Sequence, residues 1–142
     1  MIADGRAASA DAGGRVHSFL AFDYGRKRVG VATGNTVLRA AQPLGTIAAE
    51  GEARFAAIAA LIAEWRPDAL VVGVPFHPDG AAHDNTARAR RFARQLHGRF
   101  RLAVHEVDER YTTVEALAAG ARDADAAAAA VILDQFFRER QP

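Results

Sequence analysis

The 142-residue chain contains no cysteine and one lysine, and its two serines lie within the first eighteen residues. Without cysteine there is no disulfide and no cysteine-built zinc site, which excludes a secreted domain stabilised by disulfides. The five histidines never form an H-x-H or H-x-x-x-H pair, so a zinc site built on histidine is not expected. The position of the serines excludes a serine nucleophile in the main part of the chain.

Long apolar runs are also missing, since no stretch approaches the roughly 20 residues of a membrane-spanning helix. Residues 1–18 lack the basic start and the apolar middle of a signal peptide. We expect them to form a disordered or weakly ordered extension of a cytoplasmic protein that does not contact a membrane. Residues 19–142 are expected to form one domain, which would bury about two-thirds of its unfolded surface.

Positive charge is clustered rather than abundant. The formal net charge is only +1, and all basic residues except Lys27 are arginine. Between Asp84 and Arg101 the local balance is +5, because one aspartate stands against six arginines, at positions 88, 90, 91, 94, 99 and 101. A guanidinium group can donate two parallel hydrogen bonds to a phosphate, so this cluster indicates a phosphate-bearing partner.

The spacing of apolar residues predicts five strands and four helices. The expected elements are strands at 19–25, 29–34 and 42–47, a helix at 52–65, a strand at 69–74, a helix at 86–97 closed by Gly98, a strand at 102–107, a short helix at 114–119 and a last helix at about 125–138. This order predicts an α/β fold with a mixed five-stranded sheet and helices on both faces. Right-handed crossovers would place the first strand in the middle, beside the fourth.

Three acidic positions stand out in this arrangement. Asp23 ends the first strand, the pair Asp108 and Glu109 ends the fifth, and Asp125 begins the last helix on its apolar stripe. Carboxylates brought together at the strand ends cannot all stay ionised unless a cation lies between them. Mg²⁺ and Mn²⁺ prefer such oxygen ligands, and a pair of these ions can activate water for phosphodiester cleavage.

Each acid also has a simpler interpretation. Either Asp123 or Asp125 could be the N-cap of the last helix, and Asp108 could form a surface ion pair with Arg110. Asp23 precedes a turn in which Gly25 and Gly30 would let the backbone bend tightly and would let a bulky ligand come close. The spacing alone leaves these alternatives open, although the three acids together favour a metal site.

Five segments in order resemble the YqgF/RuvX family, and the resemblance extends from Phe19 to Phe137. The segments are 22–31 (FDYGRKRVGV), 72–75 (VGVP) with Asp79-Gly80, 86–92 (TARARRF), 108–116 (DERYTTVEA) and 125–133 (DAAAAAVIL). The family has the RNase H-like fold of the Holliday junction resolvases, and its members are regarded as pre-16S ribosomal RNA nucleases or as junction resolvases. The chain departs from it in a shorter connection before the last helix, and in Phe76-His77, where members usually carry a Leu-Asn-like pair.

The resemblance implies a metal-dependent endonuclease that processes the 5′ end of precursor 16S rRNA. Asp23, Glu109 and Asp125 would hold Mg²⁺ or Mn²⁺, with Asp108 as an alternate ligand among the catalytic residues. The residues expected to contact backbone phosphates are Arg26, Lys27, Arg28, Arg88, Arg91 and Arg110. The expected partners are structured RNA, branched DNA and precursor ribosomal particles, for a protein that is a monomer or a weak homodimer.

Three alternative functions also fit parts of the sequence. A Holliday junction resolvase would share the metal chemistry but would require a dimer with two sites. A nucleic-acid-binding module without catalysis would follow if the shorter connection removes activity. An ATPase of the actin and sugar-kinase superfamily would need a second lobe to enclose its nucleotide, and this chain has residues for only one.

Overall fold

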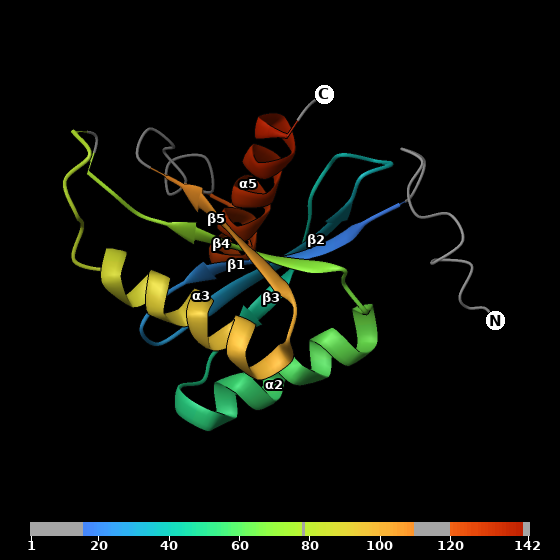
Figure 1. The fold of residues 1–142 in the computed structure, drawn as a ribbon, viewed down its shortest axis with the longest axis horizontal. Coiled ribbons are helices and arrows are strands. Elements are labelled where there is room, and N and C mark those ends of the chain that lie inside the picture. Colours follow the sequence, from blue (N-terminus) through green and yellow to red (C-terminus); the bar gives the residue numbers. More distant parts are fainter. Residues whose placement is uncertain (1–15, 78, 110–119, 141–142) are drawn as a thin grey trace.

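The computed structural model describes residues 16–77, 79–109 and 120–140 (Figure 1). The elements are β1 (Ser18–Tyr24), β2 (Val29–Asn35), β3 (Gln42–Ile47), α2 (Gly51–Trp65), β4 (Ala69–Val74), α3 (Thr86–Phe100), β5 (Ala103–Asp108) and α5 (Ala124–Glu139). All five expected strands and the three longer expected helices are present within those ranges. The short helix expected at 114–119 lies outside the described residues, as do residues 1–15.

The strands form one mixed sheet in the order β3-β2-β1-β4-β5. β1 pairs antiparallel with β2 and parallel with β4, and β4 pairs parallel with β5. The prediction that the first strand lies in the middle, beside the fourth, is therefore confirmed. α5 covers one face of the sheet, and α2 and α3 lie on the other (Figure 1).

Alternation along the central strand divides its side chains between two cores. Phe19 and Ala21 pack with α5, whereas Leu20 and Phe22 pack with α2 and α3. Successive side chains of a strand point to opposite faces, so this parity also decides the face on which each later residue of β1 lies. Both cores are fully apolar at the centre, and Leu20, Ala21 and Phe22 are completely buried.

The end of α3 differs from the sequence prediction. The helix continues past Gly98 to Phe100, and Arg101 takes the left-handed conformation, with φ of 58°. The Arg101 N–H donates to the His97 carbonyl at 3.0 Å, which closes the last turn without a glycine. Phe100, four residues after Leu96, packs partly buried against the same core, so continued burial of the apolar stripe outweighs the weak helix propensity of Gly98.

No helix in the described ranges is long and apolar enough to cross a membrane.

Candidate active site

Asp23 lies near the end of the central strand, on the face that α5 covers. It has the same parity as Phe19 and Ala21, which pack with α5, and it is half-buried. Across the antiparallel pair its partner is Gly30 of β2. The strand-end acid predicted from the sequence is therefore held in regular sheet between neighbouring strands.

Gly30 allows the start of α5 to rest directly on the sheet beside Asp23. A Cβ at this position would collide with the backbone carbonyl of Asp125 and lie 3.0 Å from the Ala126 nitrogen. The expectation that Gly30 makes room for a ligand is therefore wrong, because the helix backbone fills that space. The same contact places Asp125 next to the Asp23–Gly30 pair.

Asp123, rather than Asp125, is the N-cap of α5. Its Oδ1 accepts hydrogen bonds from the Thr46 hydroxyl at 2.6 Å and from the Ala126 N–H at 3.0 Å. These bonds to Thr46 and Ala126 lower the pKa of the Asp123 carboxyl, and the positive charge of Arg28 adds to the effect. Of the two alternatives left open by spacing, the capping role belongs to Asp123.

Asp125 lies in the first turn of α5, where its carboxylate meets a residue of the β1–β2 turn. Its Oδ2 lies 2.9 Å from Nε of Arg28. Ala129, Ile132 and Phe136, which share the predicted stripe with Asp125, are all buried against the sheet. The predicted stripe is thus confirmed. The half-buried carboxylate of Asp125 lies at the N-terminal end of this stripe and pairs with Arg28.

Glu109 reaches the same face from the end of β5. Its backbone N–H donates to the Val74 carbonyl at 3.0 Å, which continues the pairing with β4. Its carboxylate lies over Gly73, where a Cβ would collide with Oε2 of Glu109 and with Ile132 of α5. Gly73 follows Val72, the partner of Phe22 in β1, so it flanks Asp23 on the side opposite Gly30.

Gly73 was missed by the sequence analysis. The available signal was a single glycine inside an otherwise continuous apolar strand, which often marks close approach by another group. Here the group is the side chain of Glu109.

Asp108 points away from these acids. Along β5, His105 contacts the ring of Phe136 on the α5 face, whereas Glu106 lies 3.4 Å from Nε of Arg90 on α3. Asp108 has the parity of Glu106, and Glu109 has that of His105. Of the two strand-end acids, only Glu109 therefore shares a face with Asp23.

The three carboxylates are of the type that binds divalent cations, but in this structure they lie too far apart to hold one together. Asp23, Glu109 and Asp125 supply the hard oxygen ligands that Mg²⁺ and Mn²⁺ prefer. Among the residues that the structure describes, however, no three acidic or histidine side chains are close enough to hold a metal ion together. Arg28 also neutralises Asp125. The acids share one face, and closing around a cation requires side-chain movement.

The basic residues predicted to contact phosphate divide into separate groups. Arg26, Arg88 and Arg91 line one pocket on the α2 and α3 side of the sheet. Arg28 instead pairs with Asp125. Lys27, between Arg26 and Arg28 in the β1–β2 turn, is exposed. Arg110 lies outside the described residues.

Comparisons with known proteins agree with this architecture. A family model described as "RuvX: Holliday junction resolvase" matches residues 17–139. A curated relative from Albidiferax ferrireducens, named "Putative pre-16S rRNA nuclease", is 72% identical over 123 residues, which cover 87% of this chain and 79% of the relative. A relative of the same name from Polaromonas sp. is 64% identical and covers 87% of this chain and 89% of its own.

Among solved structures, RuvC of T. thermophilus in complex with a Holliday junction substrate matches with a TM-score of 0.51. The match covers 87% of this chain and 95% of that chain at 17% identity, which supports the fold alone. A second structure of Thermus thermophilus RuvC gives a TM-score of 0.50 at 15% identity. The chain therefore belongs to the RuvX family and has the RNase H-like fold.

Proposed function

We propose that the protein is a metal-dependent endonuclease that processes the 5′ end of precursor 16S rRNA. Membership of the RuvX family, with relatives named as nucleases, supports a hydrolase that acts on nucleic acid. The observation that carries the proposal is the placement of Asp23, Glu109 and Asp125. Three separate elements bring these acids to one face of the sheet, at the ends of its central strands.

In this proposal Asp23, Glu109 and Asp125 hold Mg²⁺ or Mn²⁺, which when bound supplies water activation and stabilises the leaving oxygen of a phosphodiester. Asp23 is positioned by regular strand pairing with Gly30. Glu109 is anchored through its backbone bond to Val74. Asp108 is left out of the set because strand parity turns it to the other face.

Arg28 has a part of its own in the proposal. Arg28 forms an ion pair with Asp125 while the three acids are apart. The Asp125 carboxylate therefore becomes available as a metal ligand only when Arg28 releases it. The released guanidinium then lies at the edge of the acidic face, which is the sheet face that carries Asp23, Glu109 and Asp125. There it can donate to a backbone phosphate of the substrate. Arg28 would contribute affinity and orientation but no sequence information.

Asp23→Asn tests the proposal directly. Cleavage of precursor 16S rRNA in Mn²⁺ should fall about 100-fold or more, because the change removes a charged oxygen from the centre of the set. Asp84→Asn, an exposed change in the segment before α3, is the matched control and should leave cleavage intact. Wild-type cleavage by Asp23→Asn, with its melting temperature unchanged, would reject the proposal.

Holliday junction resolution is the second candidate, and the description of the matching family favours it. A resolvase must place two sites across a two-fold junction, so it must dimerise. Light scattering at working concentration, combined with cleavage of branched DNA, separates the two functions. We expect a monomer or weak homodimer in the cytoplasm that prefers precursor rRNA, free or in precursor ribosomal particles, to the junction.

A further inference from the structure

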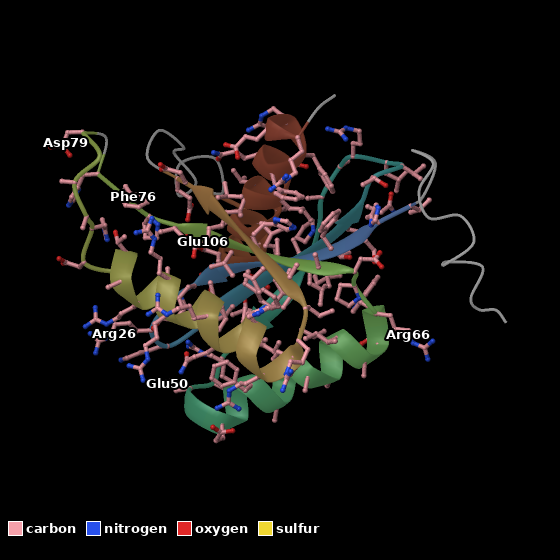
Figure 2. All side chains as sticks on the ribbon, viewed as in Figure 1. Arg26, Glu50, Arg66, Phe76, Asp79 and Glu106 are labelled. Carbon is pink, nitrogen blue, oxygen red and sulfur yellow. The ribbon has the colours of Figure 1, made fainter. Side chains whose placement is uncertain are left out.

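A separate pocket lies on the opposite face of the sheet from the acids, where α2 begins beside α3. Its volume is about 300 Å³, and residues of the β1–β2 turn, α2 and α3 line it. Figure 2 shows Arg26 and Glu50 near each other at this place. Tyr24 also lines the pocket and follows Asp23 in β1, so the two sites lie on opposite faces at one strand end.

Four arginines converge on this pocket, namely Arg26, Arg54, Arg88 and Arg91, against the single acid Glu50. The charged lining therefore carries a formal balance of +3. Within the described ranges, none of these four guanidinium groups forms an ion pair with a carboxylate. Elsewhere in the same ranges, Arg28, Arg90 and Arg99 each pair with an acid. Among the described residues, the pocket thus gathers four guanidinium groups that no carboxylate pairs with directly.

Arg54 is the fixed element of the pocket, because the residue is only 5% exposed. Its Nε donates to the Ala49 carbonyl at 2.8 Å, and its Nη2 donates to the Arg26 carbonyl at 3.0 Å. Its guanidinium carbon lies 5.5 Å from the centre of the Tyr24 ring. The two backbone carbonyls satisfy some of the hydrogen-bonding capacity of Arg54, and the Tyr24 ring lies beside its guanidinium, but neither supplies a full negative charge. An uncompensated buried charge is unfavourable.

The start of α2 adds to the positive potential of the pocket. The helix begins at Gly51, which lines the pocket, and its N-cap Glu50 makes no side-chain capping bond. The first backbone N–H groups of the helix are therefore not capped by that residue. Such N–H groups and the helix dipole favour anions near the N-terminus.

We propose that this pocket binds phosphate groups, two or more at a time, from a nucleic-acid strand or from a small polyphosphate. The balance of +3 exceeds the charge of one phosphodiester, and arginine donates to phosphate oxygens in pairs. The proposal deepens the nuclease function and rests on it for the strand as ligand. A nucleic-acid strand held here would pass the end of β1, and the acids lie on the opposite face of the sheet at that same end.

The test measures binding to the full chain in EDTA, which prevents any metal-dependent cleavage. The probes are inorganic tripolyphosphate, followed by calorimetry, and a single-stranded RNA 12-mer, followed by fluorescence anisotropy. Arg88→Gln and Arg91→Gln should each weaken binding about tenfold, because each removes a charged donor to phosphate. For RNA, each change should also reduce the slope of log affinity against log salt by about one.

Arg94→Gln is the matched control, because it removes the same charge from the same helix at an exposed position outside the pocket. It should change affinity less than about twofold. Arg88 and Arg91 are exposed as well, so all three variants should fold. Loss of RNA binding alone would identify the strand as the ligand, and loss of both would show that either source of phosphate enters.

Two results would overturn the phosphate pocket: wild-type binding of both probes by Arg88→Gln and Arg91→Gln, or an equal loss in Arg94→Gln. The Asp23→Asn variant tests the pocket independently of the nuclease proposal. It should bind RNA in EDTA as the wild type does, whatever its effect on cleavage. Unimpaired cleavage by Asp23→Asn would therefore reject the acids as the nuclease site. The binding measurements in EDTA would still test the phosphate pocket.

Discussion

Arg28 and Asp125 form an ion pair with 2.9 Å between Nε and Oδ2, which joins the β1–β2 turn to the first turn of α5. The pair spans the two elements that meet where Gly30 contacts the backbone of Asp125. It neutralises a carboxylate on the face that Asp23 and Glu109 share. The same carboxylate cannot serve Arg28 and a divalent cation equally well, so the pair would compete with the metal ion that we propose for this face.

Replacing Arg28 should strengthen metal binding. The side chain of Arg28 is 64% exposed, so its pair with Asp125 contributes less than about 1 kcal/mol. Arg28→Gln should therefore bind Mn²⁺ about threefold more tightly, as measured by titration of the free-ion signal in electron paramagnetic resonance. Lys27→Gln removes a charge from the same turn without breaking the pair, and should have a smaller effect. Weaker Mn²⁺ binding by Arg28→Gln would contradict the competition.

Gly30→Ala should destabilise the fold strongly. The added Cβ would meet the backbone of Asp125 and Ala126, which cannot turn aside as a flexible side chain does. We expect the free energy of unfolding in urea to fall by about 3 kcal/mol. Gly45→Ala in β3 is the control, because nothing lies within 4 Å of its Cβ position. Equal stability of the two variants would show that α5 moves away from β2 easily.

Gly73→Ala should leave the protein folded but displace Glu109. The new Cβ would meet the carboxylate end of Glu109 and the Cδ1 of Ile132, both of which can move. If Glu109 is a metal ligand, Mn²⁺ affinity should fall about tenfold, in the range seen when groups that orient ligands are changed. Adding Ile132→Val removes the apolar part of the clash. Recovery of full Mn²⁺ affinity in that double variant would contradict a role for Glu109.

Asp123→Ala should lower stability by about 1 kcal/mol at neutral pH, since it removes the N-cap of α5. Hydrogen bonds from Thr46 and Ala126 lower the pKa of this carboxyl in the folded state. Its contribution is therefore present above the unfolded pKa, near 4, and is lost as the pH falls through the lower folded value. Urea unfolding from pH 7 downward should show the difference from wild type shrinking below about pH 4.

Asp125→Ala separates capping from the proposed metal role. Asp125 lies in the first turn of the helix, two residues after the N-cap, and does not cap it, so this change should cost clearly less stability than Asp123→Ala. It should nevertheless abolish Mn²⁺ binding at the acidic face, which Asp123→Ala should retain. The reverse pattern would assign the structural role to Asp125 and remove it from the candidate site.

The order of elements, the central position of β1 and the stripe that packs α5 on the sheet could all be predicted from the sequence. These features depend on local apolar periodicity, which the chain shows clearly, and on the handedness of crossovers. The position of Asp23 near the end of β1 could be predicted for the same reason, because an acid that ends a buried run is visible along the chain, whereas its role as a metal ligand stays a prediction. The five ordered motifs then identified the family.

Only the tertiary structure decided which acids share a face and which arginines share a pocket. Asp108 and Glu109 are adjacent in sequence, yet strand parity and the glycine at 73 send only Glu109 toward Asp23. Arg26, Arg54 and Arg88 come from three elements, and nothing in their spacing indicates that they meet. Such contacts depend on how elements distant in sequence pack on the sheet, whereas periodicity reports only which way each element faces.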